Sequence, residues 1–171
     1  MKALLVVDML VDFIDPSGAL YIGPVAGSLV EGVRERLAHY RTNKGLVIYI
    51  CDHHLDDDLE FKMFPPHSLA GSRGAAIVDE LAPEPGERVI YKRRYSAFFG
   101  TDLDLTLREK NVSEIELAGC VTNICILYTA AEARNLNYQV TVYEQAVNGF
   151  DQEAHRFALQ EMQKTLGVIL K

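Results

Sequence analysis

The chain has 171 residues, of which 49% are hydrophobic and 24% are charged, and its formal net charge is −7. This length allows one domain with a sizeable core, so we expect residues 1–171 to form a single domain. The acidic balance argues against nucleic acids and anionic membranes as partners, because both bind basic surfaces.

The first residues and the cysteine count indicate the cellular compartment of the protein. No stretch approaches the ~18 apolar residues of a membrane span. The apolar run of "MKALLVVDML" is interrupted by Asp8 and lacks a secretory cleavage site. An odd count of three cysteines without an export signal favours a reducing cytoplasm with free thiols. A disulfide between Cys120 and Cys125 stays open on the sequence alone.

Strand and helix patterns alternate from the first residues onward. Residues 3–8 are an apolar run rich in β-branched side chains, and residues 25–41 place their apolar side chains on one helical face. A second buried strand is predicted at 45–52. It is followed by residues 53–87, a segment without strong periodicity and therefore a functional or mobile loop.

The second half of the chain continues this alternation. Further strands are predicted at 88–91, 114–119, 139–145 and 167–170. Further helices are predicted at 101–110, at 123–135 and after Asp151, the last with a face of Ala154, Phe157, Ala158 and Met162. Strands that are apolar on both faces and separated by helices predict a mostly parallel sheet of about six strands. The expected fold is a three-layer α/β/α sandwich of the Rossmann-like class.

Reactive side chains stand where successive strands of this sheet end. The first strand ends at Asp8, the second at Asp52 and the third near Lys92. The fourth ends near Cys120, and Cys125 follows one loop later. Open α/β sheets place their sites at the carboxyl ends of their strands. We therefore expect these groups to share one edge of the sheet.

Asp8, Lys92 and Cys125 could form a nucleophilic site. A thiol has a pKa of about 8.5 and must ionise to attack, which a neighbouring cation and a helix N-terminus both favour. Lys92 would supply the cation, and Asp8 would accept the thiol proton and later activate water. Each residue alone is more often structural, but the combination at the strand ends favours function. Cys120 is interpreted as core packing.

The second strand and the long loop also carry a possible metal site. Asp52 and His54 are two residues apart, so an extended backbone points both to the same side, and His67 returns from the loop behind two prolines. Two imidazoles and a carboxylate suit zinc, and also iron or manganese. Glu60 lies in the same loop and could be a fourth ligand. The competing interpretation is a solvated acidic loop, and residues 56–58 are expected to be solvated.

Five segments in order carry a family resemblance. They are "LLVVDMLVDF", "CDHH", "FPPHSLAGSRGAAIVDEL", "YKRRYSAFFGTDLDLTLRE" and "LAGCVTNICILYTAAEA". On these segments the chain resembles the isochorismatase-like cysteine hydrolases, and most closely their nicotinamidase branch. The resemblance runs nearly end to end and implies the isochorismatase-like form of the α/β fold.

The resemblance also implies roles for single residues. It gives an Asp8–Lys92–Cys125 triad, with Lys92 chosen over Arg93 because it stands three residues before the tyrosine of "YSAF". It implies a cis peptide bond between Cys120 and Val121, and an oxyanion hole formed by the N–H groups of Val121 and Cys125. A second set of implied roles concerns the pocket and the metal: Phe13 for substrate binding, and Asp52, His54, His67 and, in some members, Glu60 as ligands.

Two departures from the nicotinamidase pattern are visible. Leu10 and Val11 replace the usual Gln and Asn after the first strand, and His53 stands between the Asp and His ligands where an aromatic residue is usual. Relatives are often dimers or tetramers, so the resemblance also implies a homo-oligomer.

The expected activity is hydrolysis of the C–N bond of a small linear amide. The nicotinamidase reaction converts nicotinamide and water to nicotinic acid and ammonia through a cysteine thioester, with a divalent metal, zinc by preference, binding the substrate ring. Alternatives within the family are a vinyl-ether hydrolase of the isochorismatase type and another small-amide or carbamoyl hydrolase. A non-catalytic metal-binding or thiol-redox protein is the alternative from a different class.

Overall fold

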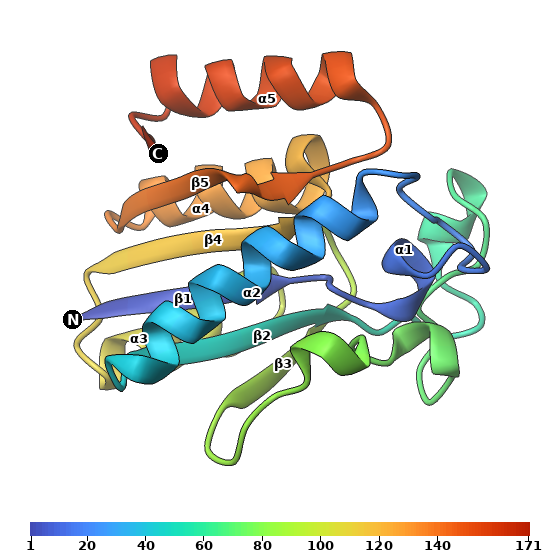
Figure 1. The fold of residues 1–171 in the computed structure, drawn as a ribbon, viewed down its shortest axis with the longest axis horizontal. Coiled ribbons are helices and arrows are strands. Elements are labelled where there is room, and N and C mark those ends of the chain that lie inside the picture. The colour runs from blue at the N-terminus through green and yellow to red at the C-terminus, as the bar shows by residue number, and fades with distance from the viewer.

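The structure, a computed structural model that describes residues 1–171, is built on one six-stranded sheet (Figure 1). Its strands are β1 (Lys2–Val7), β2 (Leu46–Asp52), β3 (Arg88–Lys92), β4 (Glu114–Cys120), β5 (Gln139–Asn148) and β6 (Ile169–Leu170). Their order across the sheet is β3-β2-β1-β4-β5-β6, and every neighbouring pair is parallel. The predicted sheet of about six strands is confirmed, and it is parallel throughout.

Helices cover both faces of the sheet. They are α1 (Val11–Ile14), α2 (Ala26–Thr42), α3 (Leu103–Glu109), α4 (Leu127–Asn135) and α5 (Gln152–Lys164). Alternate residues of β1 point to opposite faces, as the period of two requires, so Leu4 packs with α2 while Leu5 packs with α3 and α4. Figure 1 shows α2 in front of the sheet and α3 and α4 behind it. This is the predicted three-layer arrangement.

The final helix begins as predicted but buries only part of the predicted face. The carboxylate of Asp151 accepts the N–H groups of Glu153 and Ala154, which is the expected N-terminal cap. The buried residues of α5 are Ala158, Leu159 and Met162. Phe157, predicted to face the core, is 62% exposed. It stands about 100° around the helix from Ala158, outside the buried stripe.

The predicted helix at 123–135 divides into two parts. Residues Thr122–Ile126 form a turn of π-helix, and α4 follows at Leu127. Single π-turns are frequent at functional sites. Just before this turn, Gly119 has φ +121°, and a Cβ there would lie 2.0 Å from the carbonyl oxygen of Val7. Only glycine lets β4 approach β1 this closely.

The segment 53–87 is folded onto the carboxyl edge of the sheet. It contains three short 3₁₀ turns, Leu59–Lys62, Arg73–Ala75 and Asp79–Leu81. Isolated bridges join His54 to Leu69 and Leu10 to Ile77, so the segment returns to β2 and to the end of β1. None of the helices has the combined length and hydrophobicity needed to cross a membrane.

Candidate active site

Lys92 joins the acids and the thiol at the carboxyl edge of the sheet. It is paired with Asp52 in the register of β3 and β2, and Asp8 directly follows β1. Its Nζ lies 2.8 Å from Asp8 Oδ2, donates a hydrogen bond to Asp52 Oδ1, and donates another to Cys125 Sγ at 3.3 Å. All four residues are buried. The prediction that these groups share one edge is confirmed.

Asp8 is held in place from three sides. Its backbone has φ 51°, a left-handed conformation that is uncommon for residues other than glycine and concentrates at functional sites. The Asp8 N–H donates to the Ile50 carbonyl, and Asp8 Oδ1 accepts the N–H of Asp52, both at 2.8 Å. Cys120 Sγ donates to the Asp8 carbonyl at 3.1 Å. A carboxylate oxygen of Asp8 lies within 4.8 Å of Cys125 Sγ.

Burial controls the protonation of these groups. Burial and the neighbouring Asp52 raise the pKa of Asp8 to about 6, although Lys92 opposes the shift. Burial also raises the pKa of the Cys125 thiol well above its usual range, against the pull of Lys92. For Lys92 burial favours the neutral amine, but Asp52 and Asp8 outweigh it and raise the ammonium pKa. In the resting site, desolvation of the thiol outweighs the pull of the cation, so ionisation of Cys125 requires a base, the role expected of Asp8.

The turn that carries the nucleophile candidate begins at a backbone N–H with no backbone acceptor. The Cys120–Val121 peptide bond is cis, as the resemblance implies. The Val121 carbonyl accepts the N–H groups of Ile124 and Ile126, whereas the Val121 N–H donates to no backbone carbonyl. Cys51, Cys120 and Cys125 are all free thiols, so the open question of a disulfide is answered. The role of Val121 and Cys125 as oxyanion donors stays a prediction.

Four donor atoms converge beside the triad. Asp52 Oδ2 lies 3.6 Å from His54 Nε2 and 3.8 Å from His67 Nε2. Glu60 Oε1 lies 4.0 and 3.9 Å from the same two nitrogens. Tetrahedral zinc with bonds of 2.0–2.1 Å spaces its ligands about 3.4 Å apart, so these four carboxylate–histidine distances are close to that spacing.

The chemistry of the donors also fits a metal ion. His54 Nε2 is fully buried and has no hydrogen-bond partner, which is unusual for a buried polar atom. The opposite ring nitrogen of each histidine is engaged, by Asp58 Oδ2 at 3.1 Å for His54 and by the Pro65 carbonyl at 2.8 Å for His67. Such contacts hold the imidazole in the tautomer that presents Nε2 to a metal.

Asp58 corrects one prediction from the sequence. Asp56 and Asp57 are exposed as expected, but Asp58 is buried and hydrogen-bonded to His54. No local pattern distinguishes it from its two neighbours.

Asp52 belongs to both clusters. Its Oδ1 accepts from Lys92, while its Oδ2 faces His54 and His67. Burial alone would raise the pKa of Asp52, but Lys92 and the two histidines hold it well below its usual range. One charged carboxylate thus connects the triad to the candidate metal ligands.

A small cavity opens onto both clusters. It is about 20 Å³ and is lined by Phe13, Leu20, Asp52, Glu60, Phe64, His67, Tyr95, Val121, Ile124, Cys125 and Phe150. This volume holds little more than one water, so a ring-sized ligand enters only when the lining side chains move. No lysine or arginine is among the lining residues.

Sequence reasoning found only part of this lining. Phe13 lies in the cavity wall as predicted. Phe150 was missed because the connection after β5 has no recognisable pattern. His53, at the position of the usual pocket aromatic, instead stacks on the exposed Tyr91 with ring centroids 4.2 Å apart. The cavity lining does not include it.

Asp12 is another residue that the sequence did not single out. Its carboxylate accepts the N–H of Ser68 at 2.7 Å and of Ala19 at 3.1 Å. A Cβ on Gly74 would lie 2.2 Å from this carboxylate. Asp12 therefore ties α1, which carries Phe13, to the loop that presents His67.

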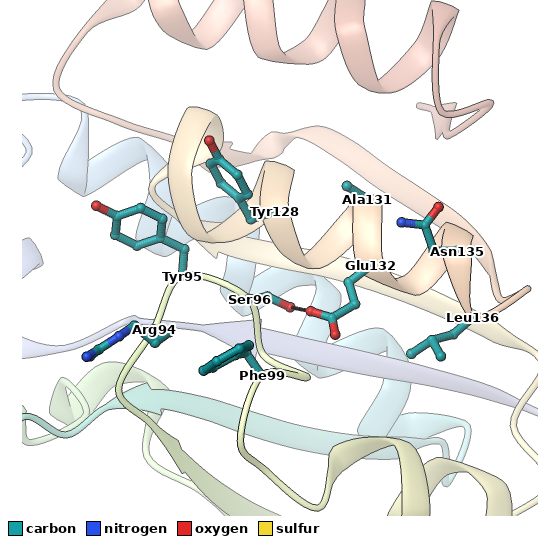
Figure 2. Close-up of a pocket in the computed structure, with 9 residues that line it drawn as sticks. All are labelled: Arg94, Tyr95, Ser96, Phe99, Tyr128, Ala131, Glu132, Asn135 and Leu136. Atoms are coloured by element: carbon teal, nitrogen blue, oxygen red, sulfur yellow. Dashed lines mark hydrogen bonds between the residues drawn. The ribbon is translucent and has the colours of Figure 1, made fainter.

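The largest cavity lies elsewhere. Figure 2 shows it between residues 94–99 and α4, with a volume of about 630 Å³ and a hydrogen bond from Ser96 to Glu132 across it. No triad residue or candidate metal ligand lines it, and Tyr95 alone is shared with the smaller cavity. The reactive groups therefore belong to the small cavity.

Comparison with known proteins gives a consistent result. Residues 2–171 match the family model described as Isochorismatase domain. The nicotinamidase PncA from Bacillus subtilis superposes with a TM-score of 0.94 and 34% identity over 99% of this chain and 98% of that one. An N-carbamoylsarcosine amidase from Thermoplasma acidophilum gives 0.91 and 34% over 99% and 95%. A pyrazinamidase of Pyrococcus horikoshii in complex with zinc gives 0.92 and 29% over 99% and 98%.

Proposed function

The chain belongs to the isochorismatase family of hydrolases, and we propose that it hydrolyses a small neutral amide, nicotinamide, to nicotinic acid and ammonia. The observation that carries this proposal is the contact of Lys92 with both Asp8 and Cys125 in a buried site beside three convergent metal-ligand atoms. The similarity to two solved nicotinamidase or pyrazinamidase structures supports the choice of substrate.

The reaction starts with proton transfer from Cys125 to Asp8. A base with a pKa of about 6 is ionised at neutral pH and can accept this proton. Lys92 keeps its proton and stabilises the thiolate that forms. The sulfur then attacks the amide carbon, and the N–H groups of Val121 and Cys125 receive the developing oxyanion.

In the second half of the reaction Asp8 acts first as an acid and then as a base. Ammonia leaves with the proton held by Asp8, and a thioester remains on Cys125. Asp8 removes a proton from water, which attacks the thioester carbon. The acid is released, and the proton returns to the sulfur, so the site regains its resting state.

A divalent cation would be held by Asp52, His54 and His67, with Glu60 completing the set. Zinc is the ion we propose, because imidazole nitrogen and carboxylate oxygen are ligands that zinc prefers in proteins. When bound, it supplies a Lewis-acidic contact for a ring nitrogen and so orients the substrate. Phe13 lies against His67, with ring centroids 5.7 Å apart, and would pack on the ring of the substrate.

The charge of the cavity separates nicotinamide from a second candidate. The similarity to N-carbamoylsarcosine amidase supports a carbamoyl hydrolase, whose substrate carries a carboxylate. Here no cationic side chain lines the cavity, and the Lys92 ammonium already contacts two carboxylates. Asp52 and Glu60 in the lining would balance the charge of a bound divalent cation, so an anionic substrate would be desolvated without a net counter-charge, which is costly. The site therefore favours a neutral amide.

The test is ammonia release from nicotinamide, pyrazinamide, N-carbamoylsarcosine and simple aliphatic amides, with and without a chelator. We expect turnover of the two ring amides, reduced by the chelator. Turnover of aliphatic or carbamoyl substrates alone would exclude nicotinamide while retaining an amidase. Ammonia from none of them, with reversible oxidation of Cys120 and Cys125 detected by mass analysis, would favour a redox protein.

A further inference from the structure

Asp58 is a buried carboxylate with four polar contacts. It accepts from His54 Nδ1 at 3.1 Å and from the Glu60 N–H at 3.2 Å. It also accepts from Arg93 Nε at 2.9 Å and from Arg94 Nη1 at 3.0 Å. The Asp58 side chain has no exposed surface, whereas those of Arg93 and Arg94 are 46% and 42% exposed.

We propose that Asp58 is the positioning residue of the metal centre and sets two of its ligands, His54 and Glu60. The proposal rests on the metal site of the proposed function but not on the amide chemistry. Asp58 does not itself line the cavity. It acts through the residues that it holds.

The contact with His54 fixes the ring and its tautomer. An ionised carboxylate accepts the Nδ1–H, so the lone pair stays on Nε2, which faces Asp52 and His67. Without Asp58 the buried ring would lose its only side-chain partner other than the ligands themselves. It could then rotate or carry its proton on the metal-facing nitrogen.

The contact with Glu60 orders a second ligand. Asp58 is the N-terminal cap of the turn Leu59–Lys62, and its Oδ1 accepts the Glu60 N–H. Glu60 Oε1 is thereby held within 4.0 Å of both histidine Nε2 atoms. One carboxylate thus organises the side chain of one ligand and the backbone of another.

The two arginines make this buried carboxylate tolerable. A buried charge without partners is strongly destabilising. Here His54, the Glu60 N–H and the two arginines all contact the Asp58 carboxylate, so its charge is compensated. Arg93 and Arg94 directly follow Lys92, so Asp58 also connects the ligand loop to the segment that carries the triad lysine. In this acidic chain, the basic residues Arg93 and Arg94 therefore donate to a buried carboxylate.

The experiment compares Asp58→Asn with Asp57→Asn. Both remove one negative charge from adjacent positions, but Asp57 is exposed. Zinc affinity of metal-stripped protein is measured by competition with a chromophoric chelator. We expect Asp58→Asn to bind zinc about 10–100-fold more weakly than wild type and Asp57→Asn to bind it equally well. In cobalt-loaded protein, the visible absorption bands should change for Asp58→Asn only.

If Asp58→Asn does not fold, Arg93→Gln is measured in its place. We expect a smaller loss of zinc affinity for Arg93→Gln, because only one hydrogen-bond partner of Asp58 is removed. Equal zinc affinity and equal cobalt spectra for a folded Asp58 variant and wild type would overturn the proposal, as would a wild type that binds no metal. Weakened binding without turnover of any amide would overturn the proposed function and leave this inference standing.

Discussion

At the scale of single residues, the two cysteines of "GCVTNIC" have different surroundings although they are five positions apart. Cys120 Sγ donates to the backbone carbonyl of Asp8, while Cys125 Sγ accepts from Lys92 and lines the cavity. The first contact supports the backbone of the candidate base. The second places a thiol beside a cation, where it can act as a nucleophile.

Replacing each cysteine by alanine should separate these roles. Cys125→Ala should lower kcat for the hydrolysed amide by at least about 1,000-fold, because the attacking atom is removed. Cys120→Ala should retain most of the activity and lose about 1 kcal/mol of unfolding free energy with its hydrogen bond. Steady-state ammonia release and urea unfolding measure the two effects. A Cys120→Ala protein as inactive as Cys125→Ala would show that the nucleophile has been wrongly assigned.

Removing the Lys92 ammonium should make stability depend on pH. In Lys92→Met, Asp8 and Asp52 would face each other without a cation, costing about 3–5 kcal/mol at neutral pH. Their folded-state pKa values would rise above the unfolded value of about 4, so the folded state would bind more protons. Its stability should therefore fall as pH rises through these raised values.

Urea unfolding at pH 5 and pH 8 tests this sign. The stability deficit of Lys92→Met relative to wild type should be smaller at pH 5 than at pH 8. The exposed Lys62→Met is the matched control and should show no such difference. An equal deficit at both pH values would contradict the coupling of the two acids through Lys92.

The residues that could be predicted are those whose position follows from a strand end. Asp8, Asp52 and Lys92 stand at the ends of apolar runs, and a parallel sheet brings such ends together. Asp58 could not be predicted, since its burial depends on Arg93 and Arg94, 35 and 36 positions away. The role of Asp12 could not be predicted for the same reason, because its hydrogen-bond partner Ser68 is 56 positions away.

At the scale of elements, the connection from β5 to α5 supports the turn that carries Cys125. His155 Nδ1 lies 2.9 Å from Thr122 Oγ1, and Phe150 lines the cavity. A Cβ on Gly149 would lie 2.5 Å from Val121 Cγ1. The connection after β5 and the first turn of α5 thus act on the reactive turn through close packing.

Gly149→Ala should therefore disturb catalysis more than binding. The added methyl group would displace Val121 and its N–H, and we expect kcat to fall about 10-fold with KM and zinc affinity little changed. Gly27→Ala is the control, because a Cβ there meets nothing within 4 Å and Gly27 is helical. Steady-state kinetics give kcat and KM for both variants. An unchanged kcat in Gly149→Ala would show that the turn tolerates displacement.

The elements were predictable where their own residues determine them. The predicted ends of β1 to β4 agree with the structure to within about one residue, since each is an apolar run bounded by polar residues. The start of α4 was not predictable, because the π-turn at Thr122–Ile126 is shaped by Gly119, Gly149 and His155 rather than by local periodicity. β5 continues to Asn148 through a register shift against β4.

At the scale of the whole molecule, metal binding should stabilise the fold. The candidate ligands lie at the end of β2 and in the loop 53–87, so an ion would fasten that loop to the sheet. Zinc at 100 times its Kd would add about 2.7 kcal/mol to the unfolding free energy. Thermal unfolding of wild type should therefore shift upward by several degrees in zinc relative to chelator.

Histidine variants show whether this stabilisation uses the predicted site. His54→Ala should lose the zinc-dependent shift in Tm, whereas His39→Ala, on the exposed face of α2, should keep it. Equal shifts in both variants would mean that zinc binds elsewhere on the chain.

The fold as a whole followed from the alternation of strands and helices, which permits few arrangements. The cavity did not follow from it. Its walls come from side chains of α1, the loop 53–87, the segment after β3, the nucleophile turn and Phe150, and their convergence depends on packing among distant segments. Its lack of lysine and arginine could be seen only in the structure.

The two halves of the site are distributed differently along the polypeptide. Every candidate metal ligand lies within residues 52–67, while the triad draws on residues 8, 92 and 125. Contacts between near neighbours form earlier and at lower entropic cost than contacts between distant segments. During synthesis on the ribosome, the ligand loop emerges complete while Cys125 is still unmade. The candidate ligands are therefore present on one emerging segment before the triad can assemble.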